Sequence, residues 1–184
     1  MNIFVILTTA SISLILVLVG IILLLILRDS IFADVPFVPV RRYAVAKIIE
    51  LLDMRSGDVL VDMGCGDGRI LIDAVKTVSK VRGIGMEKGI IPFFVASFLS
   101  RNYPVKIRYE EISRTDISSA THIYCYLSPK LMTQLGPKFL RECQPKTKIV
   151  SCDFEIPNWM PVKKIDLDVG KETLSRTLYL YQMQ

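Results

Sequence analysis

The residues best suited to chemistry form a run of acids and glycines in the first half of the chain. A short apolar stretch that holds Asp62 is followed by glycines at alternate positions, Gly64, Gly66 and Gly68. Residues 70–78 then show the spacing of an amphipathic helix. Glycines let a backbone turn sharply, reach positive φ and bring bare amides next to a ligand. The order strand, tight loop and helix therefore predicts a ligand site at the start of the helix.

The charges around this loop narrow the class of ligand. A dinucleotide-binding loop reads G-x-G-x-x-G and holds an anionic pyrophosphate, whereas here the third glycine comes one position earlier and two acids, Asp62 and Asp67, flank the turn. These acids repel a pyrophosphate and attract a cation. S-adenosylmethionine offers an ammonium and a sulfonium to the acids and a carboxylate to the helix amides. We therefore expect this cofactor, with a nicotinamide dinucleotide as the alternative.

A second acid lies where a nucleoside is usually bound. Glu87 ends the next apolar run, 25 residues after Asp62. An acid at the end of the second strand of a strand–helix–strand unit grips the ribose hydroxyls.

The residues Asp62-Met63-Gly64-Cys65-Gly66-Asp67-Gly68-Arg69, with Glu87 behind them, resemble the signature of class I S-adenosylmethionine-dependent methyltransferases. Three further motifs resemble small membrane-anchored protein-lysine methyltransferases of mitochondria and their prokaryotic relatives: Pro36-Phe37-Val38-Pro39, Tyr126-Leu127-Ser128-Pro129 and Phe154-Glu155-Ile156-Pro157-Asn158-Trp159. That subgroup modifies the adenine nucleotide translocase and the c-ring protein of ATP synthase. The resemblance implies an α/β fold, Rossmann-like and doubly wound, with a mostly parallel sheet of seven strands.

The resemblance also assigns residues to the cofactor. It places S-adenosylmethionine on Asp62, Gly64, Cys65, Gly66, Asp67, Gly68 and Glu87. An acid just after the third strand reads the adenine amino group in such enzymes, which points to Glu111, with Asp116 as the competing candidate. The four cysteines and the one histidine, His122, are not spaced like a metal site, so we expect no metal. We expect Cys65 to be a small loop residue instead of a nucleophile.

Aromatic and acidic residues follow the fourth and fifth predicted strands, at the edge where open α/β sheets bind ligands. We expect an acceptor mouth there, which binds a lysine ammonium by cation–π contact and releases its proton to water; its members are Tyr124, Tyr126, Asp153, Phe154 and Trp159. The predicted catalytic residues are Tyr126, Asp153 and Trp159. Packing in the core is the alternative for each aromatic. The subgroup usually has a basic residue where Asp153 stands.

The amino-terminal segment predicts a membrane anchor. Residues 3–27 carry no charge and would form a helix of about 37 Å, longer than a hydrocarbon core of about 30 Å. A cleaved signal peptide, the alternative, has a basic start and a shorter apolar run. Arginines follow the span and none precedes it, which places the rest of the chain on the cytoplasmic side, or the matrix side in a mitochondrion. We divide the chain into an anchor (1–28), a juxtamembrane linker (29–40) and a methyltransferase domain (41–184).

The remaining pattern completes the expected domain. The linker residues 36–39, with two prolines, either fold over the cofactor mouth or act as a stiff spacer. Residues 41–54 have the spacing of a helix that covers the sheet, and residues 91–98 have that of a second crossover helix. Residues 105–109 alternate with charges, as in a strand near the edge of a sheet. Two alternating runs near the carboxyl terminus predict an antiparallel edge.

The sequence thus predicts an S-adenosylmethionine-dependent methyltransferase that acts on lysines of a membrane or membrane-associated protein. Two alternatives stay open: methylation of a lipid-soluble small molecule or of RNA, and a non-catalytic scaffold that binds the cofactor. The formal net charge of +5 is compatible with anionic partners or with a solvated lysine-rich surface. No dense basic run is present, so we do not expect nucleic acid as the main partner.

Overall fold

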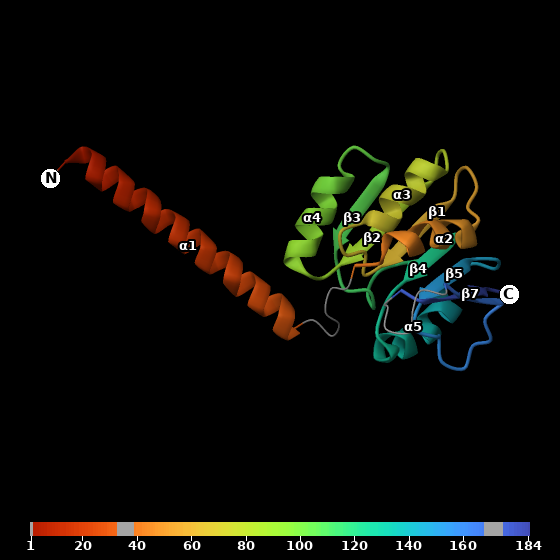
Figure 1. Ribbon diagram of the computed structural model, residues 1–184. Coiled ribbons are helices and arrows are strands. Elements are labelled where there is room, and N and C mark those ends of the chain that lie inside the picture. The colour runs from red at the N-terminus through yellow and green to blue at the C-terminus, as the bar shows by residue number, and fades with distance from the viewer. Residues whose placement is uncertain (1, 33–38, 168–174) are drawn as a thin grey trace. The chain divides into compact units, whose positions relative to one another are not determined.

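The computed structural model describes residues 2–32, 39–167 and 175–184 (Figure 1). The chain divides into two compact units, Met1–Pro36 and Phe37–Gln184. Most of the Pro36–Pro39 motif lies outside the described residues, and with it the expectation that this motif folds over the cofactor mouth.

The described part of the first unit is one long helix, α1 (Ile3–Phe32). Its stretch Ile3–Leu24 is apolar and long enough to cross a membrane. The hydroxyls within it donate to main-chain carbonyls one turn earlier, at 2.8–3.0 Å, from Thr8, Thr9 and Ser11. Such internal partners suit a helix in an apolar environment. The helix continues past residue 28, where we expected the anchor to end.

The second unit is built on the seven-stranded sheet that the sequence predicts. Its strands are β1 (Val59–Met63), β2 (Arg82–Glu87), β3 (Val105–Tyr109), β4 (His122–Cys125), β5 (Lys148–Cys152), β6 (Lys163–Asp166) and β7 (Thr177–Gln182). Their order in the sheet is β3-β2-β1-β4-β5-β7-β6. The first five strands are parallel, while β7 runs antiparallel to β5 and to β6. The predicted positions of β3 at one edge and of the antiparallel pair at the other are confirmed.

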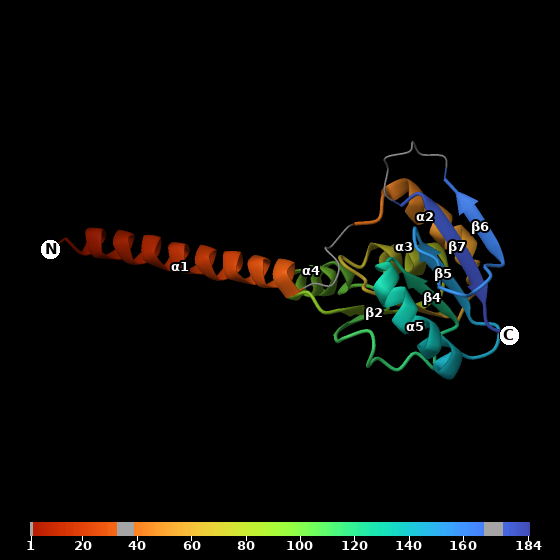
Figure 2. The same cartoon turned by 90° about the horizontal axis from the view of Figure 1, so that it is seen from below.

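Helices cover both faces of this sheet (Figure 2). On one face are α2 (Arg42–Leu52), α3 (Arg69–Thr77) and α4 (Ile90–Ser100), and α5 (Pro129–Glu142) lies on the other. Side chains that alternate along the strands feed two separate cores. Leu60 of β1 packs with α2 and α3, and its neighbour Val61 packs with α5. Every residue of β1 is buried, as expected for a central parallel strand.

Parallel strands bring their carboxyl ends to one edge of the sheet. This edge holds the loops that leave β1, β2, β3, β4 and β5, and we refer to it as the carboxyl edge. All the acids and aromatics singled out from the sequence lie on or near these loops, except where packing takes them into a core.

Candidate active site

The glycine loop joins β1 to α3 at the carboxyl edge. Gly64, Gly66 and Gly68 have φ values of 87°, 55° and 78°, a backbone region that other residues rarely adopt. The amides of Gly64 and Cys65 both donate to the carbonyl oxygen of Met86, at 3.0 and 2.9 Å. The loop is therefore held against the end of β2, as the sequence pattern predicts.

Glu87 connects two loops through its carboxylate. Its Oε2 accepts the amide N–H of Gly66 at 2.9 Å, and its Oε1 accepts the amide N–H of Gly89 at 2.7 Å. A carboxylate oxygen can accept more than one hydrogen bond, so these contacts are compatible with binding the hydroxyls of a ribose. The acid predicted for ribose thus lies directly beside the glycine loop.

Asp62 is a buried acid whose charge has no cationic neighbour in the described structure. Its exposed fraction is 2%, and its Oδ1 has no hydrogen-bond partner among the described residues. Burial, and then the negative charges of Glu87 and Asp67, raise the pKa of Asp62 well above its usual value. An unpaired buried acceptor is unfavourable unless a ligand satisfies it. The ammonium of S-adenosylmethionine is a donor of the required charge, so the residues present fit this cofactor.

Asp67 does not share this environment. Its carboxylate forms an ion pair with Arg69, at 2.6 Å between Oδ2 and Nη2. The Nη1 of the same guanidinium donates to the carbonyl of Val40 at 2.7 Å. Arg69 thus already supplies a cation to Asp67, and the expectation that Asp67 also attracts the cofactor stays a prediction. The link from Arg69 to the start of the domain was not evident from the sequence.

Cys65 contributes a backbone amide and a packing side chain. It is buried, and its Sγ lies 2.7 Å from where a Cβ on Gly85 would stand. Burial, and then the neighbouring carboxylates, raise the pKa of the thiol. Cys65 therefore fills a gap against β2, as expected for a small loop residue, and is not a thiolate nucleophile.

Two acids compete for the adenine position after β3. Asp116 accepts the amide N–H of Ser118 at 2.9 Å, and this bond holds the pKa of Asp116 below its usual value. Glu111 is exposed and forms a long ion pair with Arg114, at 3.9 Å. Asp116 thus stabilises its own turn, which leaves Glu111 as the preferred candidate.

The loops after β4 and β5 bring Tyr126, Asp153 and Phe154 together. The rings of Tyr126 and Phe154 are stacked, with centroids 6.4 Å apart and planes 27° apart. The Tyr126 hydroxyl lies close enough to the carboxylate of Asp153 for that charge to affect its pKa. Burial, and then Asp153, raise the pKa of Tyr126. A half-buried, stacked aromatic pair beside a carboxylate is a suitable surface for a cationic side chain.

Asp153 itself is a structural acceptor. Its carboxylate accepts three backbone N–H groups, from Ser175 at 2.8 Å, Arg176 at 2.7 Å and Thr177 at 3.0 Å. The backbone of Asp153 has a φ of 60°, a conformation that aspartate tolerates better than most residues. The acid therefore fixes the start of β7 beside Tyr126, which gives a physical reason for an acid at this position.

The structure does not bring Tyr124 and Trp159 into this group. Tyr124 is fully buried in the core under α2 and α3. Trp159 packs edge-on against Phe139 of α5 and Tyr181 of β7, with centroids 6.3 and 6.0 Å away, in the core on the other face. No ring contact joins either residue to the Tyr126–Phe154 pair among the described residues, so a shared aromatic mouth stays a prediction for Tyr124 and Trp159.

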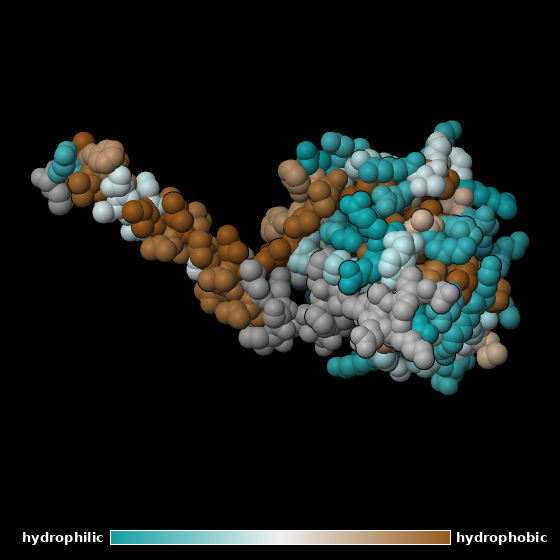
Figure 3. Space-filling view, in the orientation of Figure 1, coloured by the Kyte–Doolittle hydropathy of each residue, from teal (hydrophilic) through white to brown (hydrophobic). Residues whose placement is uncertain are grey.

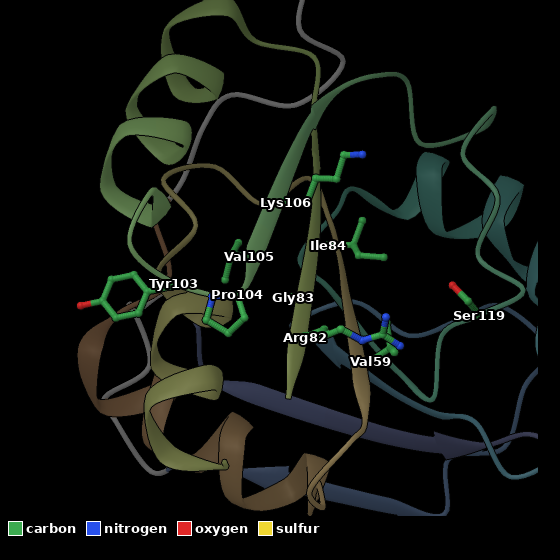
Figure 4. A pocket seen from close by; sticks show the side chains of 9 residues that line it. All are labelled: Val59, Arg82, Gly83, Ile84, Tyr103, Pro104, Val105, Lys106 and Ser119. Atoms are coloured by element: carbon green, nitrogen blue, oxygen red, sulfur yellow. The ribbon is translucent and has the colours of Figure 1, made fainter. Parts of the chain in front are cut away.

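A cavity of about 430 Å³ lies at the opposite edge of the sheet (Figure 4). Its lining includes the first residues of three strands, Val59, Arg82 and Val105. Open α/β sheets bind ligands at the carboxyl ends of their strands, so this cavity is not where we place the cofactor.

Comparisons with known proteins agree with this geometry. A family model described as the ANTKMT methyltransferase domain matches residues 62–163. The chain is 32% identical over 154 residues to a protein-lysine N-methyltransferase of Saccharolobus islandicus (strain REY15A), which covers 80% of this chain and 92% of that protein. It is 27% identical over 128 residues to the lysine N-methyltransferase of the ATP synthase c-ring protein of Xenopus laevis, which covers 68% of this chain and 56% of that protein.

A solved structure is similar over most of the chain. It is an RNA methyltransferase from Salinibacter ruber in complex with S-adenosyl-L-homocysteine, with a TM-score of 0.73 and 32% sequence identity. The match covers 79% of this chain and 94% of that chain. That protein shares the fold of this chain and binds S-adenosyl-L-homocysteine, the product that S-adenosylmethionine leaves after methyl transfer.

Proposed function

The chain belongs to the ANTKMT-type family of S-adenosylmethionine-dependent methyltransferases, and we propose that it methylates lysine side chains of a protein that lies in or next to a membrane. The observation that carries the proposal is the buried, unpaired Asp62 carboxylate beside the glycine loop. The relatives named for lysine methylation support the choice of acceptor. The Xenopus relative acts on a component of ATP synthase, and this chain spans about half of its length.

S-adenosylmethionine supplies a methyl group that its sulfonium has already activated. The residues of this chain then have to bind, orient and shield the reactants. Asp62 would hold the ammonium, the amides at the start of α3 the carboxylate, Glu87 the ribose hydroxyls and Glu111 the adenine amino group. Cys65 and the three glycines, Gly64, Gly66 and Gly68, leave the room that this requires. Asp67 acts indirectly, by holding Arg69.

The acceptor lysine enters between Tyr126 and Phe154. A free lysine has a pKa of about 10.4, so the amine arrives protonated and must lose its proton before it attacks. The aromatic faces bind the ammonium, and exclusion of water there favours the neutral amine. The Asp153 carboxylate already accepts three amides, so its role is to position Tyr126, while the proton leaves to bulk water. Trp159 has no contact in this arrangement and is left out of it.

Anchoring by α1 suits an acceptor at a membrane. A tether raises the local concentration of targets at the bilayer surface. Arg28, Arg41 and Arg42 follow the span, so the domain lies on the cytoplasmic side, or on the matrix side of a mitochondrial membrane.

Methyl transfer to membranes tests this proposal. The full chain is incubated with radiolabelled S-adenosylmethionine and membranes from cells that lack the enzyme, and protein, lipid and RNA are then separated. We expect the label in protein, as methyl-lysine after acid hydrolysis, and its absence with the Asp62→Asn variant. Label found only in extracted lipid would overturn the choice of acceptor.

RNA is the second acceptor to test, because the Salinibacter ruber protein is an RNA methyltransferase. The same fractions decide between the two. Label that ribonuclease releases, with none in methyl-lysine, would favour RNA.

A further inference from the structure

Helix α4 exposes large apolar side chains and buries small ones, which is unusual for a helix on the surface of a domain. The side chains that it buries are small, Ala96 and Ser100. The side chains that it exposes are large and apolar: Phe94 (65% exposed), Val95, Phe98 (63% exposed) and Leu99. An ordinary surface helix has the opposite pattern, with its apolar side chains against the core.

The exposed residues form one continuous stripe. Phe94, Val95, Phe98 and Leu99 are spaced at i, i+1, i+4 and i+5, which places them on the same side of a helix. None of the eleven residues of α4 carries a charge. Figure 3 shows apolar surface over this helix. A contiguous apolar patch on an otherwise polar domain marks a contact with an apolar partner.

Basic residues flank helix α4 at both ends. Lys88 precedes α4 and Arg101 follows it, and no acid occurs in residues 88–101. The Arg101 guanidinium lies 4.0 Å from the centroid of the Phe98 ring, and its Nη1 donates to the Phe98 carbonyl at 2.8 Å. Apolar and aromatic side chains between basic residues are typical of helices that lie in the interface of an anionic bilayer.

The short connection between α1 and the second unit limits how far the domain can lie from a membrane that α1 spans. Helix α1, which contains the candidate span, ends at Phe32, and Val40 is already buried in the second unit. The residues between them can extend by at most about 28 Å. If α1 spans a membrane, the domain cannot leave its surface.

We propose that α4 is a membrane-binding helix whose Phe94 and Phe98 insert among the lipid acyl chains. This inference rests on the anchoring in the proposed function, and it specifies where the acceptor lysine lies. Helix α4 starts shortly after Glu87, and Ala96 packs on the glycine loop, 3.5 Å from where a Cβ on Gly68 would stand. A bilayer bound by α4 holds the carboxyl edge at the headgroups, so the acceptors are lysines at that depth.

Quenching by brominated lipids tests the insertion. The full chain is placed in nanodiscs whose lipids carry bromine on their acyl chains, and tryptophan emission is compared with that in unbrominated discs. Phe98→Trp places a reporter on α4, and Leu140→Trp places one on α5, where Leu140 is 66% exposed. The parent protein corrects for Trp159. We expect the added emission of Phe98→Trp to be mostly quenched and that of Leu140→Trp to be unchanged.

Equal quenching of the two reporters would overturn the inference. The same holds if Phe98→Trp is unquenched and the chains cross-link through α4, which would indicate a second copy on this face. Because quenching requires no turnover, an inactive protein that is quenched would refute the proposed function and leave this inference intact.

A functional variant adds a second readout. Phe94→Ser combined with Phe98→Ser keeps α1 and the site residues. We expect methyl transfer to membrane acceptors to fall by about tenfold, while the affinity for S-adenosylmethionine changes by less than about twofold. Unchanged transfer to membrane acceptors would contradict the inference.

Discussion

The two halves of the carboxyl edge are held by different means. In the half that we propose for the cofactor (the cofactor half: the glycine loop, Asp62, Glu87 and Glu111), backbone conformation and amide hydrogen bonds set the geometry of the loop and of Glu87. In the half that we propose for the acceptor (the substrate half: Tyr126, Asp153 and Phe154), contacts between distant parts of the chain set the geometry. The first half is suited to one invariant ligand.

We expect the largest effect on cofactor binding from substitution of Asp62. We expect Asp62→Asn to weaken the binding of S-adenosylmethionine by about 100-fold, because the ammonium loses a buried opposite charge. Isothermal titration calorimetry measures this, with the exposed Glu50→Gln as the control. Binding within threefold of the wild type would remove Asp62 from the cofactor half.

The same variant has an effect on stability with the opposite sign. The raised pKa of Asp62 means that the folded protein keeps this proton to a higher pH than the unfolded chain, so the unliganded fold loses stability as the pH rises above about 3.8. The side chain of asparagine does not ionise, so the Asp62→Asn variant does not lose stability in this way as the pH rises. Without ligand, the melting temperature of Asp62→Asn should therefore exceed that of the wild type by a margin that grows with pH and then levels off. A lower melting temperature at neutral pH would contradict the assignment of an unpaired buried charge.

We expect the next largest effect on cofactor binding from substitution of Glu87. We expect Glu87→Gln to weaken cofactor binding by about 30-fold, because its hydrogen bonds to hydroxyls lose the charge of the acceptor while the side chain keeps its shape. Titration with adenosine separates the ribose contact from the others. If adenosine binding is unaffected, Glu87 holds the loop and does not bind the ribose.

Tyr126 tests whether the halves are separable. We expect Tyr126→Phe to lower turnover by about tenfold and to change cofactor affinity by less than about twofold, because the hydroxyl orients the acceptor side only. Steady-state rates and calorimetry on one preparation measure both, with Tyr179→Phe on β7 as the control. Cofactor binding that falls in parallel with turnover would show that the halves act as one.

Asp153 should have a smaller effect that depends on Tyr126. We expect Asp153→Asn to lower turnover by about threefold and to destabilise the fold by about 2 kcal/mol, since three amides lose a charged acceptor. A double-mutant cycle with Tyr126→Phe identifies the route. Additive losses in turnover would indicate that Asp153 does not act through Tyr126.

Trp159 should have the smallest effect on catalysis. We expect Trp159→Phe to lower the free energy of unfolding by about 1 kcal/mol, because two edge-on contacts are weakened, and to leave turnover per folded molecule within about twofold. Denaturant unfolding and initial rates provide the two numbers. A tenfold loss of turnover in a stable variant would return Trp159 to the acceptor site.

The cofactor half could be predicted from the sequence because its signals are local. The glycines, Asp62 and Glu87 lie on one strand–loop–helix–strand unit, and glycine adopts the backbone conformation of these turns more readily than other residues. The fold followed from the same kind of signal, including β3 at one edge and the antiparallel pair at the other. The ion pair that occupies Asp67 was not predicted, because charge alone does not tell a partner in the chain from a ligand.

The substrate half could be predicted only in part, because its contacts are long-range. The N–H groups that donate to Asp153 lie 22–24 residues later in the sequence, at the start of β7. The sequence pattern does not show that β7 pairs with β5. The aromatic residues near this edge were all expected to line one acceptor site. In the structure, Trp159 packs against the core on the α5 side of the sheet, and Tyr124 is buried within β4 while Tyr126 follows that strand. The spacing of residues 91–98 predicted a second crossover helix but not that its apolar stripe is exposed, because periodicity identifies an apolar side without saying what covers it.

A crystal structure of the full chain with S-adenosyl-L-homocysteine tests the central claim most directly. We predict the ligand ammonium within about 3.2 Å of Asp62 Oδ1, the ribose hydroxyls on Glu87 and the sulfur facing the Tyr126–Phe154 pair. A ligand bound at the opposite edge of the sheet, or with its ammonium turned away from Asp62, would contradict the account.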